Sequence, residues 1–254
     1  MVPAFLLQAR ERRGGRKMSL FFPDYSFRRV YEIPSRFFLE QGVRVLLLDV
    51  DNTLTTHDNP TPHREVLAWL DAQREAGLRL FLLSNNTPER VAPFAQKIGL
   101  EFIARAKKPL PFPLWRTLKG MGIPPRQAAI IGDQIFTDVL CGRLSRCLSV
   151  LVEPMEEEDW GFLATKRRWE KQVLRRYTPR QWQPNPQMEG WELAFCGECG
   201  SCFRKGSSQM AGLCPECAHY LYGYPGCGHL FENGRCVRCG WDGSESPYIR
   251  KLKR

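Results

Sequence analysis

Several short segments carry side chains that could bind one ligand together. Asp49 and Asp51 lie two residues apart directly after an apolar stretch, and residues i and i+2 of a strand face the same side. Polar residues also follow three later apolar stretches. These groups are Ser84-Asn85-Asn86, Lys107-Lys108-Pro109, and Gly132-Asp133 with Asp138 five residues later. Any single group could merely cap a turn or a helix, but the ordered series of four predicts one polar crevice.

A second set of residues has the spacing of zinc ligands. Cys-x-x-Cys and Cys-x-His pairs crowd the last quarter of the chain, and structural zinc takes four such ligands in a tetrahedron. The spacing predicts a first site from Cys196, Cys199, Cys214 and Cys217, and a second from Cys227, His229, Cys236 and Cys239. A short, Gly-rich segment buries little core, so zinc binding should supply its folding free energy.

The assignment of zinc ligands leaves two alternatives open. Cys202 is left over, and it could replace Cys196 if the first knuckle slid along the chain. His219 could substitute for a ligand in either site. Because both sets are already complete, we expect structural rather than catalytic zinc.

The crevice needs elements that bring its four segments together. Strand-like apolar stretches alternate with helix-like stretches, two of which begin at Thr61-Pro62 and Thr87-Pro88, where threonine is the expected N-cap. The predicted strands are 44–50, 78–83, 101–104, 128–131 and 147–152, and the predicted helices are 61–76, 87–99, 114–119 and 137–144. This alternation predicts an α/β, Rossmann-like domain with a mainly parallel sheet covered on both faces. Such sheets bind ligands beyond the carboxyl ends of their strands, where the polar segments lie.

Two segments that flank this core mix basic and aromatic residues. Residues 21–38 could pack against the core or form a strip that rests on a membrane. Residues 162–177 are a helix candidate, and within 166–180 seven basic residues accompany a single acid, Glu170. A solvated helix face, a membrane contact and a nucleic-acid contact are each compatible with that composition.

Shifts in composition divide the chain. We expect a disordered arm at 1–17, with Met18 as an alternative start of translation, and a sheet domain at 18–178. A Pro-, Gln- and Asn-rich linker at 179–190 leads to a double zinc ribbon at 191–243 and a basic tail at 244–254.

The overall composition is that of a globular protein. The 254 residues are 43% hydrophobic and 25% charged, and no apolar stretch approaches the roughly 18 residues of a membrane-spanning helix. With 37 Lys and Arg against 27 Asp and Glu, the net charge of +10 favours an anionic partner, either nucleic acid or an acidic lipid surface. No secretory signal is visible, and paired cysteines suit metal binding, so we expect a cytoplasmic location.

The four polar segments resemble a known family. DVDNT, a serine after an apolar strand, a Lys-Pro and GDQIFTD, in that order, resemble the four motifs of the haloacid dehalogenase superfamily of phosphatases. The stretch from about Leu20 to Val152 is most similar to its subfamily IIIA phosphatases of the YqeG type, whose relatives include phosphatidylglycerophosphate phosphatases. The resemblance covers a little over half of the chain and does not extend to the cysteine-rich tail.

The resemblance implies roles for individual residues. Asp49 would be the nucleophile that forms an aspartyl-phosphate, and Asp51 the general acid and then base. Asp49, Asp133 and the main-chain carbonyl of Asp51 would bind Mg²⁺. Ser84 would hydrogen-bond the phosphoryl group and Lys108 would neutralise it.

Other residues of the motifs have weaker assignments. Asn52, Thr53 and Asn85 are candidate substrate-binding residues by the same resemblance. Lys107 competes with Lys108, which we prefer because a proline follows it. Asp138 would stand beside the metal without binding it directly, or would be a helix N-cap.

The spacing of the motifs also bears on the substrate. In this superfamily a lid domain is inserted between the first and second motifs or between the second and third. Here the intervals from Asp51 to Ser84 and from Ser84 to Lys108 hold one helix-and-strand unit each, so no cap domain fits. An open crevice suits a phosphate on a large or surface-bound substrate. The resemblance favours phosphatidylglycerophosphate, and the basic flanks would let the enzyme rest peripherally on an anionic membrane.

Two other functions are compatible with the sequence. The chain could be a nucleic-acid or ribosome-associated binding protein, with the phosphatase core as a scaffold and the zinc ribbons making the contact. It could also be a phosphatase for a nucleic-acid end or a phosphoprotein, recruited through the ribbons. Strong, salt-sensitive RNA binding with negligible turnover would favour the first.

Overall fold

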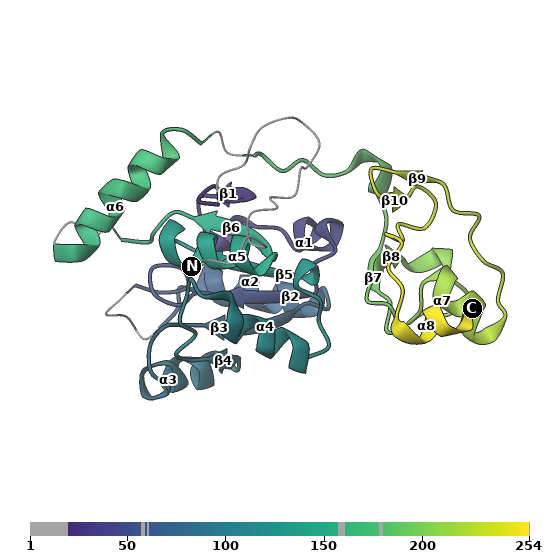
Figure 1. The fold of residues 1–254 in the computed structure, drawn as a ribbon, viewed down its shortest axis with the longest axis horizontal. Helices are drawn as coiled ribbons and strands as arrows, with labels where there is room; N and C mark the ends of the chain where they lie inside the picture. The colour runs from purple at the N-terminus through teal and green to yellow at the C-terminus, as the bar shows by residue number, and fades with distance from the viewer. Residues whose placement is uncertain (1–19, 57–58, 60, 157–160, 178–179, 254) are drawn as a thin grey trace, which may run out of the picture.

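The computed structural model describes residues 20–56, 59, 61–156, 161–177 and 180–253 (Figure 1). The predicted arm at 1–17 lies outside these residues. Most of the described chain before the linker builds one sheet with helices on both sides, and the cysteine-rich part forms a smaller unit beside it.

The central sheet has six strands, all paired in parallel, in the order β1-β6-β5-β2-β3-β4. The strands are β1 (Tyr25–Phe27), β2 (Val45–Leu48), β3 (Arg79–Leu83), β4 (Glu101–Ile103), β5 (Ala128–Gly132) and β6 (Leu148–Val152). In the centre, Leu48 of β2 is in register with Leu82 of β3 and Ile131 of β5. The predicted parallel α/β fold is therefore confirmed.

Five helices cover the two faces of this sheet. They are α1 (Ser35–Gln41), α2 (Arg64–Glu75), α3 (Pro88–Ile98), α4 (Pro111–Gly120) and α5 (Leu140–Ser145). Because strand side chains alternate, Leu46 and Leu48 pack in the layer of α1, α2 and α3, whereas Val45 and Leu47 pack in the layer of α4 and α5. The apolar strands are thus buried on both faces, as a parallel sheet requires.

Of the two helix starts predicted from a Thr-Pro pair, one was correct and one was wrong. Helix α3 begins at Pro88 after its N-cap Thr87 and ends at its C-cap Gly99, as expected. Helix α2 instead begins at Arg64 with His63 as N-cap, so the predicted start at Thr61-Pro62 was wrong. A threonine followed by proline marks a helix start only when the next residues also adopt helical backbone, and here they do so two residues later.

The aromatic segment at 21–38 packs into the core. It contributes the edge strand β1 and helix α1, and Phe37 and Phe38 are completely buried. Tyr25 and Phe27 make edge-to-face contacts with Phe37, at ring-centroid distances of 4.9 and 5.2 Å. Of the two alternatives for this segment, core packing is the one that the structure contains.

Helix α6 (Gly161–Leu174) follows the sheet, and the smaller C-terminal unit comes after it (Figure 1). That unit consists of β7 (Leu193–Phe195), β8 (Cys202–Arg204), α7 (Pro215–Tyr222), β9 (Phe231–Glu232), β10 (Arg235–Cys236) and α8 (Pro247–Leu252). Helix α8, in the predicted basic tail, buries Ile249 against the cysteine-rich core.

The C-terminal unit packs against the amino ends of two central strands. Gln127, directly before β5, donates a 3.2 Å hydrogen bond to the carbonyl of Gly200. Arg44, directly before β2, stacks its guanidinium 5.8 Å from the ring centroid of Phe195. Cys202 is completely buried and belongs to the hydrophobic core of the sheet domain. The unit therefore lies where the central strands begin, at the opposite end from their carboxyl ends.

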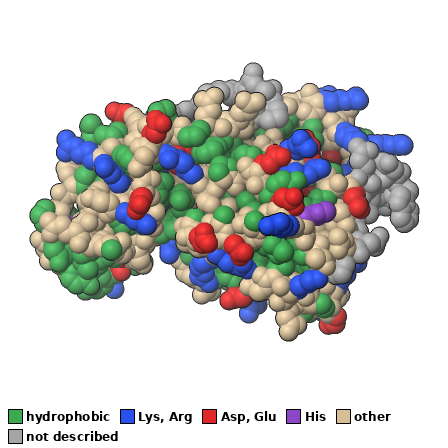
Figure 2. All heavy atoms as spheres, turned by 180° about the vertical axis from the view of Figure 1, so that it is seen from behind, with side chains coloured by type: hydrophobic (Ala, Val, Ile, Leu, Met, Phe, Trp, Pro, Cys, Tyr) green, Lys and Arg blue, Asp and Glu red, His purple; other side chains and the backbone are tan. Residues whose placement is uncertain are grey.

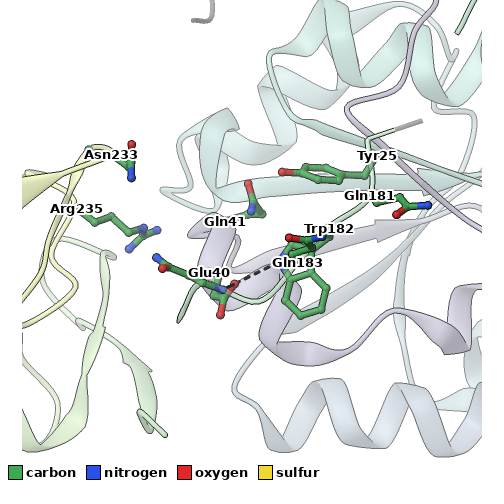
Figure 3. A pocket seen from close by; sticks show the side chains of 10 residues that line it. Tyr25, Glu40, Gln41, Gln181, Trp182, Gln183, Asn233 and Arg235 are labelled. Atoms are coloured by element: carbon green, nitrogen blue, oxygen red, sulfur yellow. Dashed lines mark hydrogen bonds between the residues drawn. The ribbon is translucent and has the colours of Figure 1, made fainter. Parts of the chain in front are cut away.

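A polar cavity of about 490 Å³ lies between the two parts of the chain (Figure 3). Glu40 and Gln41 of α1 and Trp182 of the linker line one side, and Asn233 and Arg235 of the C-terminal unit line the other. Its lining contains none of the carboxylates of the predicted crevice.

Hydrophobic side chains gather on the surface of the C-terminal unit, which is the left end of the molecule in Figure 2. This unit exposes several large apolar side chains, namely Tyr220, Tyr222, Tyr224, Leu230, Phe231, Tyr248 and Leu252. Among the described residues, no helix combines the length and the hydropathy needed to span a membrane.

Candidate active site

Three carboxylates meet at the carboxyl ends of β2 and β5. Asp49 follows β2, Asp133 follows β5, and Asp138 lies in the π-helical turn Ile135–Val139. One oxygen from each lies within 4.8 Å of the others, and all three residues are buried. Asp138 is inside this turn, whose N-cap is Gln134, so the N-cap alternative for Asp138 was wrong.

Lys108 stands between two of these carboxylates. Its Nζ donates hydrogen bonds of 2.7 Å to Asp49 Oδ1 and 2.6 Å to Asp138 Oδ1, and its side chain is only 3% exposed. Burial alone would lower the pKa of this lysine, but the charges of Asp138 and Asp49 raise that pKa above its ordinary value. Lys107 is exposed. The lysine in the crevice is therefore Lys108, charged and held by two carboxylates.

Burial also raises the pKa values of two of the carboxylates. Burial and the charge of Asp138 raise the pKa of Asp49 to about 7, although Lys108 opposes the rise. Burial likewise raises the pKa of Asp133 well above its ordinary value, against the opposing charge of Arg167. Such shifts mark a site with more negative charge than the side chains present can neutralise.

Asp51 is not part of the cluster of three carboxylates. Its Oδ2 accepts a 2.8 Å hydrogen bond from Asn86 Nδ2, and its Oδ1 lies 4.0 Å from Arg90 Nη2 of α3. The side chain is 23% exposed, more than that of Asp49. The Asp49-x-Asp51 pair thus provides one buried carboxylate and one that solvent can reach.

The segment after β3 supports the same crevice. Ser84 is buried, and its Oγ accepts a 3.1 Å hydrogen bond from the main-chain N–H of Asn86. The amide of Asn85 forms two hydrogen bonds with the main chain of Lys108, donating 3.1 Å to its carbonyl and accepting 2.7 Å from its N–H. Asn85 therefore fixes the backbone of Lys108, and its assignment to substrate stays a prediction.

Asn52 and Thr53 are buried in the turn after Asp51. Asn52 has a positive φ of 58° and accepts a 3.2 Å hydrogen bond through Oδ1 from the N–H of Glu156. Thr53 Oγ1 is buried and has no hydrogen-bond partner among the described residues. An unpaired buried hydroxyl is costly, so this atom is available to a ligand or a water.

Gly132 makes room for the carboxylate of Asp138. A Cβ at this position would lie 2.3 Å from Cγ of Asp138, a distance that no pair of non-bonded carbons tolerates. The glycine in the Gly132-Asp133 sequence is therefore required by the close approach of a functional side chain.

Helix α6 supplies two residues that the sequence reasoning missed. Arg167 donates a 2.8 Å hydrogen bond to the carbonyl of Asp133 and pairs with its Oδ2. Glu170, only 4% exposed, accepts hydrogen bonds from the N–H groups of Ile135 and Phe136 at 2.8 and 3.2 Å. The sequence contained one signal, since Glu170 is the single acid among the basic residues at 166–180.

The carboxylate cluster has the chemistry of a magnesium site. Its donors are the hard oxygens that Mg²⁺ prefers. Asp133 Oδ1 is buried and has no hydrogen-bond partner among the described residues, which leaves a lone pair for an ion. Asp49, Asp133 and Asp138 therefore fit a divalent cation, and the side chain of Asp51 is not part of this cluster.

The cysteine clusters fit two zinc ribbons. Cys196, Cys199, Cys214 and Cys217 bring their sulfurs within 4.8 Å of one another, and so do the ligand atoms of Cys227, His229, Cys236 and Cys239. These are the two predicted sets. Cys202 belongs to neither, because its side chain is buried in the hydrophobic core of the sheet domain. His219 is bonded through Nδ1 to the carbonyl of Tyr224 at 2.7 Å.

Comparison with known proteins agrees with this geometry. The model of the haloacid dehalogenase-like hydrolase family matches residues 26–144. The protein named Probable phosphatase YqeG, from Bacillus subtilis (strain 168), is 32% identical over 156 residues, which are 61% of this chain and 88% of that protein.

Solved structures match at lower identity. 4-Nitrophenylphosphatase from Thermotoga maritima is 13% identical, with a TM-score of 0.40 over 47% of this chain and 89% of its own. 3-Deoxy-D-manno-octulosonate 8-phosphate phosphatase from Moraxella catarrhalis is 18% identical, with a TM-score of 0.33 over 39% of this chain and 63% of its own. The 32% identity across 88% of YqeG, together with the family match over the four motifs, shows that this chain belongs to the haloacid dehalogenase-like hydrolases.

Proposed function

We propose that this protein is a magnesium-dependent phosphomonoester hydrolase that works through an aspartyl-phosphate on Asp49. The observation that carries the proposal is the cluster of Asp49, Asp133 and Asp138, in which Asp49 and Asp138 accept hydrogen bonds from the amino group of Lys108. A buried carboxylate beside a buried ammonium group can attack phosphorus while the attacking and transferred charges are neutralised.

The reaction has two steps. A carboxylate oxygen of Asp49 forms a bond to phosphorus, the bond from phosphorus to the ester oxygen breaks, and Asp51 gives its proton to the leaving oxygen. Asp51 then takes a proton from water, whose oxygen attacks phosphorus and releases inorganic phosphate with Asp49 restored. The hydrogen bond from Asn86 holds Asp51 outside the carboxylate cluster, where it can exchange protons with solvent.

Other side chains bind the transferred group. Lys108 offers its charge to the phosphoryl oxygens, and Ser84 can donate its hydroxyl proton because its Oγ accepts from the main chain of Asn86. Mg²⁺, held by Asp49 and Asp133 with Asp138 beside it, would screen the repulsion between an anionic nucleophile and an anionic phosphate. Thr53 Oγ1 is a further candidate donor to the substrate.

The best candidate substrate is phosphatidylglycerophosphate. Between Asp51 and Ser84 the described residues form only α2 and β3, and between Ser84 and Lys108 they form only α3 and β4, so no lid encloses the crevice. An open crevice can receive a phosphate that projects from a membrane surface. Recruitment of the substrate by the zinc ribbons is less favoured. The ribbons contact the amino ends of the strands, whereas the crevice lies at their carboxyl ends.

The zinc ribbons are proposed as structural sites. Each would supply folding free energy to a unit whose own hydrophobic core consists largely of the metal ligands. Contact with a protein or nucleic acid through this unit stays an alternative.

The first test measures phosphate release from phosphatidylglycerophosphate in mixed micelles with Mg²⁺. Asp49→Asn removes the nucleophile and should lower the rate by about a thousandfold or more. Asp71→Asn is the matched control, since Asp71 is exposed on α2 and forms only a surface ion pair with Arg74; this variant should keep full activity.

The outcomes separate the parts of the proposal. Hydrolysis of an aryl phosphate without hydrolysis of the lipid would leave the mechanism and reject the substrate. Absence of turnover with both compounds would reject the hydrolase and favour the nucleic-acid-binding alternative, which a salt titration of RNA binding would then examine.

A further inference from the structure

Helix α6 reaches the metal site although it lies outside the four motifs. Its inward side carries Arg167 and Glu170, which contact the chain between Asp133 and Phe136. Val173 and Leu174, one turn further along, pack against the hydrophobic cluster of Ile135, Val139 and Leu151. The helix is therefore fastened to the loop that carries a metal ligand, by both charged and apolar contacts.

The two charged residues form one connected network. Arg167 Nη1 donates to Glu170 Oε2 at 3.0 Å and to the carbonyl of Asp133 at 2.8 Å, while Nη2 pairs with Asp133 Oδ2. Glu170 Oε1 accepts from the two N–H groups that follow. Main chain and side chain of the ligand loop are thus held from the same helix.

We propose that Arg167 and Glu170 are positioning residues that orient Asp133 for the catalytic metal. Arg167 holds Oδ2 of Asp133, so that Oδ1, the buried oxygen without a partner, is the one presented to the ion. Glu170 keeps Arg167 and the turn after Asp133 in place. The proposal rests on the magnesium site of the proposed function and extends it to a helix beyond the motifs.

Electrostatics and orientation make opposite predictions, which makes the proposal testable. The positive charge of Arg167 repels a cation, so if charge were its only effect, its removal would tighten metal binding. If the residue orients a ligand, its removal weakens binding, because loss of such an outer hydrogen bond typically costs 10–100-fold in metal affinity.

The experiment measures Mn²⁺ binding to the zinc-loaded full-length protein by the loss of the free Mn²⁺ electron paramagnetic resonance signal. We expect Arg167→Ala and Glu170→Ala each to raise the Mn²⁺ dissociation constant by about 10–100-fold. The double variant should bind Mn²⁺ little more weakly than the single variant with the larger loss of affinity, because the two residues act through one network.

Arg168→Ala is the matched control, since Arg168 is the exposed neighbour on the same helix, and its Mn²⁺ affinity should equal that of the wild type. Arg167→Lys keeps the charge but has no guanidinium fork to hold two groups at once, so its affinity should also fall. This variant tests the proposal even if Arg167→Ala does not fold, as judged by thermal unfolding.

The steady-state parameters give an independent reading. With saturating Mg²⁺ the kcat of Arg167→Ala on an aryl phosphate should recover towards the wild-type value, while the Mg²⁺ concentration for half-maximal rate stays raised. Unchanged or tighter Mn²⁺ binding in Arg167→Ala and Arg167→Lys would overturn the proposal. Because Mn²⁺ binding needs no turnover, loss of the proposed hydrolase activity alone would leave this inference standing.

Discussion

At the scale of single residues, the site is a balance of buried positive and negative charges. Two of the three buried carboxylates accept hydrogen bonds from the ammonium group of Lys108, and the third, that of Asp133, pairs with Arg167. Because burial and the neighbouring charge of Asp138 penalise the ionised form of Asp49, its pKa rises to about 7. A divalent cation would remove this penalty, which is why the acidic cluster and the metal belong together physically.

The carboxylate of Asp138 occupies the space that a side chain at Gly132 would fill. Gly132→Ala would put a Cβ 2.3 Å from Cγ of Asp138, so that carboxylate must move away from Lys108. We expect a loss of about 1–3 kcal/mol in the free energy of unfolding and a fall of about a hundredfold in kcat. Thermal unfolding and hydrolysis of an aryl phosphate measure the two effects.

The control for this substitution is Gly120→Ala at the end of α4. A Cβ there meets no atom within 4 Å, so stability and activity should be unchanged or slightly improved. A Gly132→Ala variant with wild-type kcat would show that the position of Asp138 is not needed for the chemistry.

At the scale of elements, helix α7 links the two zinc clusters. It begins directly after Cys214 and carries Glu216, whose Oε2 accepts a 3.0 Å hydrogen bond from Nε2 of His229. The other ring nitrogen of His229, Nδ1, lies 3.6 Å from the sulfur of Cys239 and so faces the second cluster. A carboxylate behind a histidine ligand fixes the tautomer and orientation of the ring.

Replacing this carboxylate should weaken one zinc site selectively. We expect Glu216→Ala to lower zinc affinity at the second cluster by about 10–100-fold and to leave the first cluster unchanged. Competition with a chromophoric chelator would resolve the two affinities. Glu245→Ala is the control because Glu245 shares Lys253 with Glu216 and does not touch His229. Equal effects of the two variants would mean that the charge of Lys253, and not the histidine contact, matters.

At the scale of the whole molecule, the strands of the sheet have different partners at their carboxyl ends and at their amino ends. Helix α6 and the carboxylates lie at the carboxyl ends of the strands, whereas the cysteine-rich unit contacts residues directly before β2 and β5. Figure 1 shows α6 and the cysteine-rich unit on opposite sides of the sheet. Cys202, Leu193 and Phe195 of that unit pack into the core of the sheet domain. The cysteine-rich unit is therefore part of the folded body rather than a freely tethered module.

Zinc loss should consequently destabilise the sheet domain. A zinc-selective chelator, added with excess Mg²⁺, should lower the midpoint of calorimetric unfolding of the sheet domain, by about 2–4 °C for each kcal/mol of stabilisation lost. Restored zinc should restore the midpoint. Two separate transitions, with the larger one indifferent to the chelator, would show that the ribbons fold independently of the sheet.

Local chemistry explains what could be predicted for the site. Asp49, Lys108 and Asp133 were placed in one crevice because each follows a strand, and parallel strands end at one edge. The two clusters of cysteine and histidine were predicted because the ligands of one zinc ion recur at characteristic spacings. Arg90 and Arg167 were not predicted, since a basic residue on a helix has no local feature that distinguishes a partnered side chain from a solvated one.

By itself, the sequence determined the alternation of strands and helices, the polar segments at the strand ends and the two sets of residues that cluster with the spacing of zinc ligands. Strand and helix patterns repeat every two to four residues, and the ligands of one metal ion come in closely spaced pairs. Local sequence is therefore enough to predict them. Only the tertiary structure decided that β1 joins the sheet edge, that Arg167 reaches Asp133 across 34 residues, and that Gln127 meets Gly200 across 73. Such contacts arise from the packing of whole elements, and no local pattern encodes which surfaces will meet.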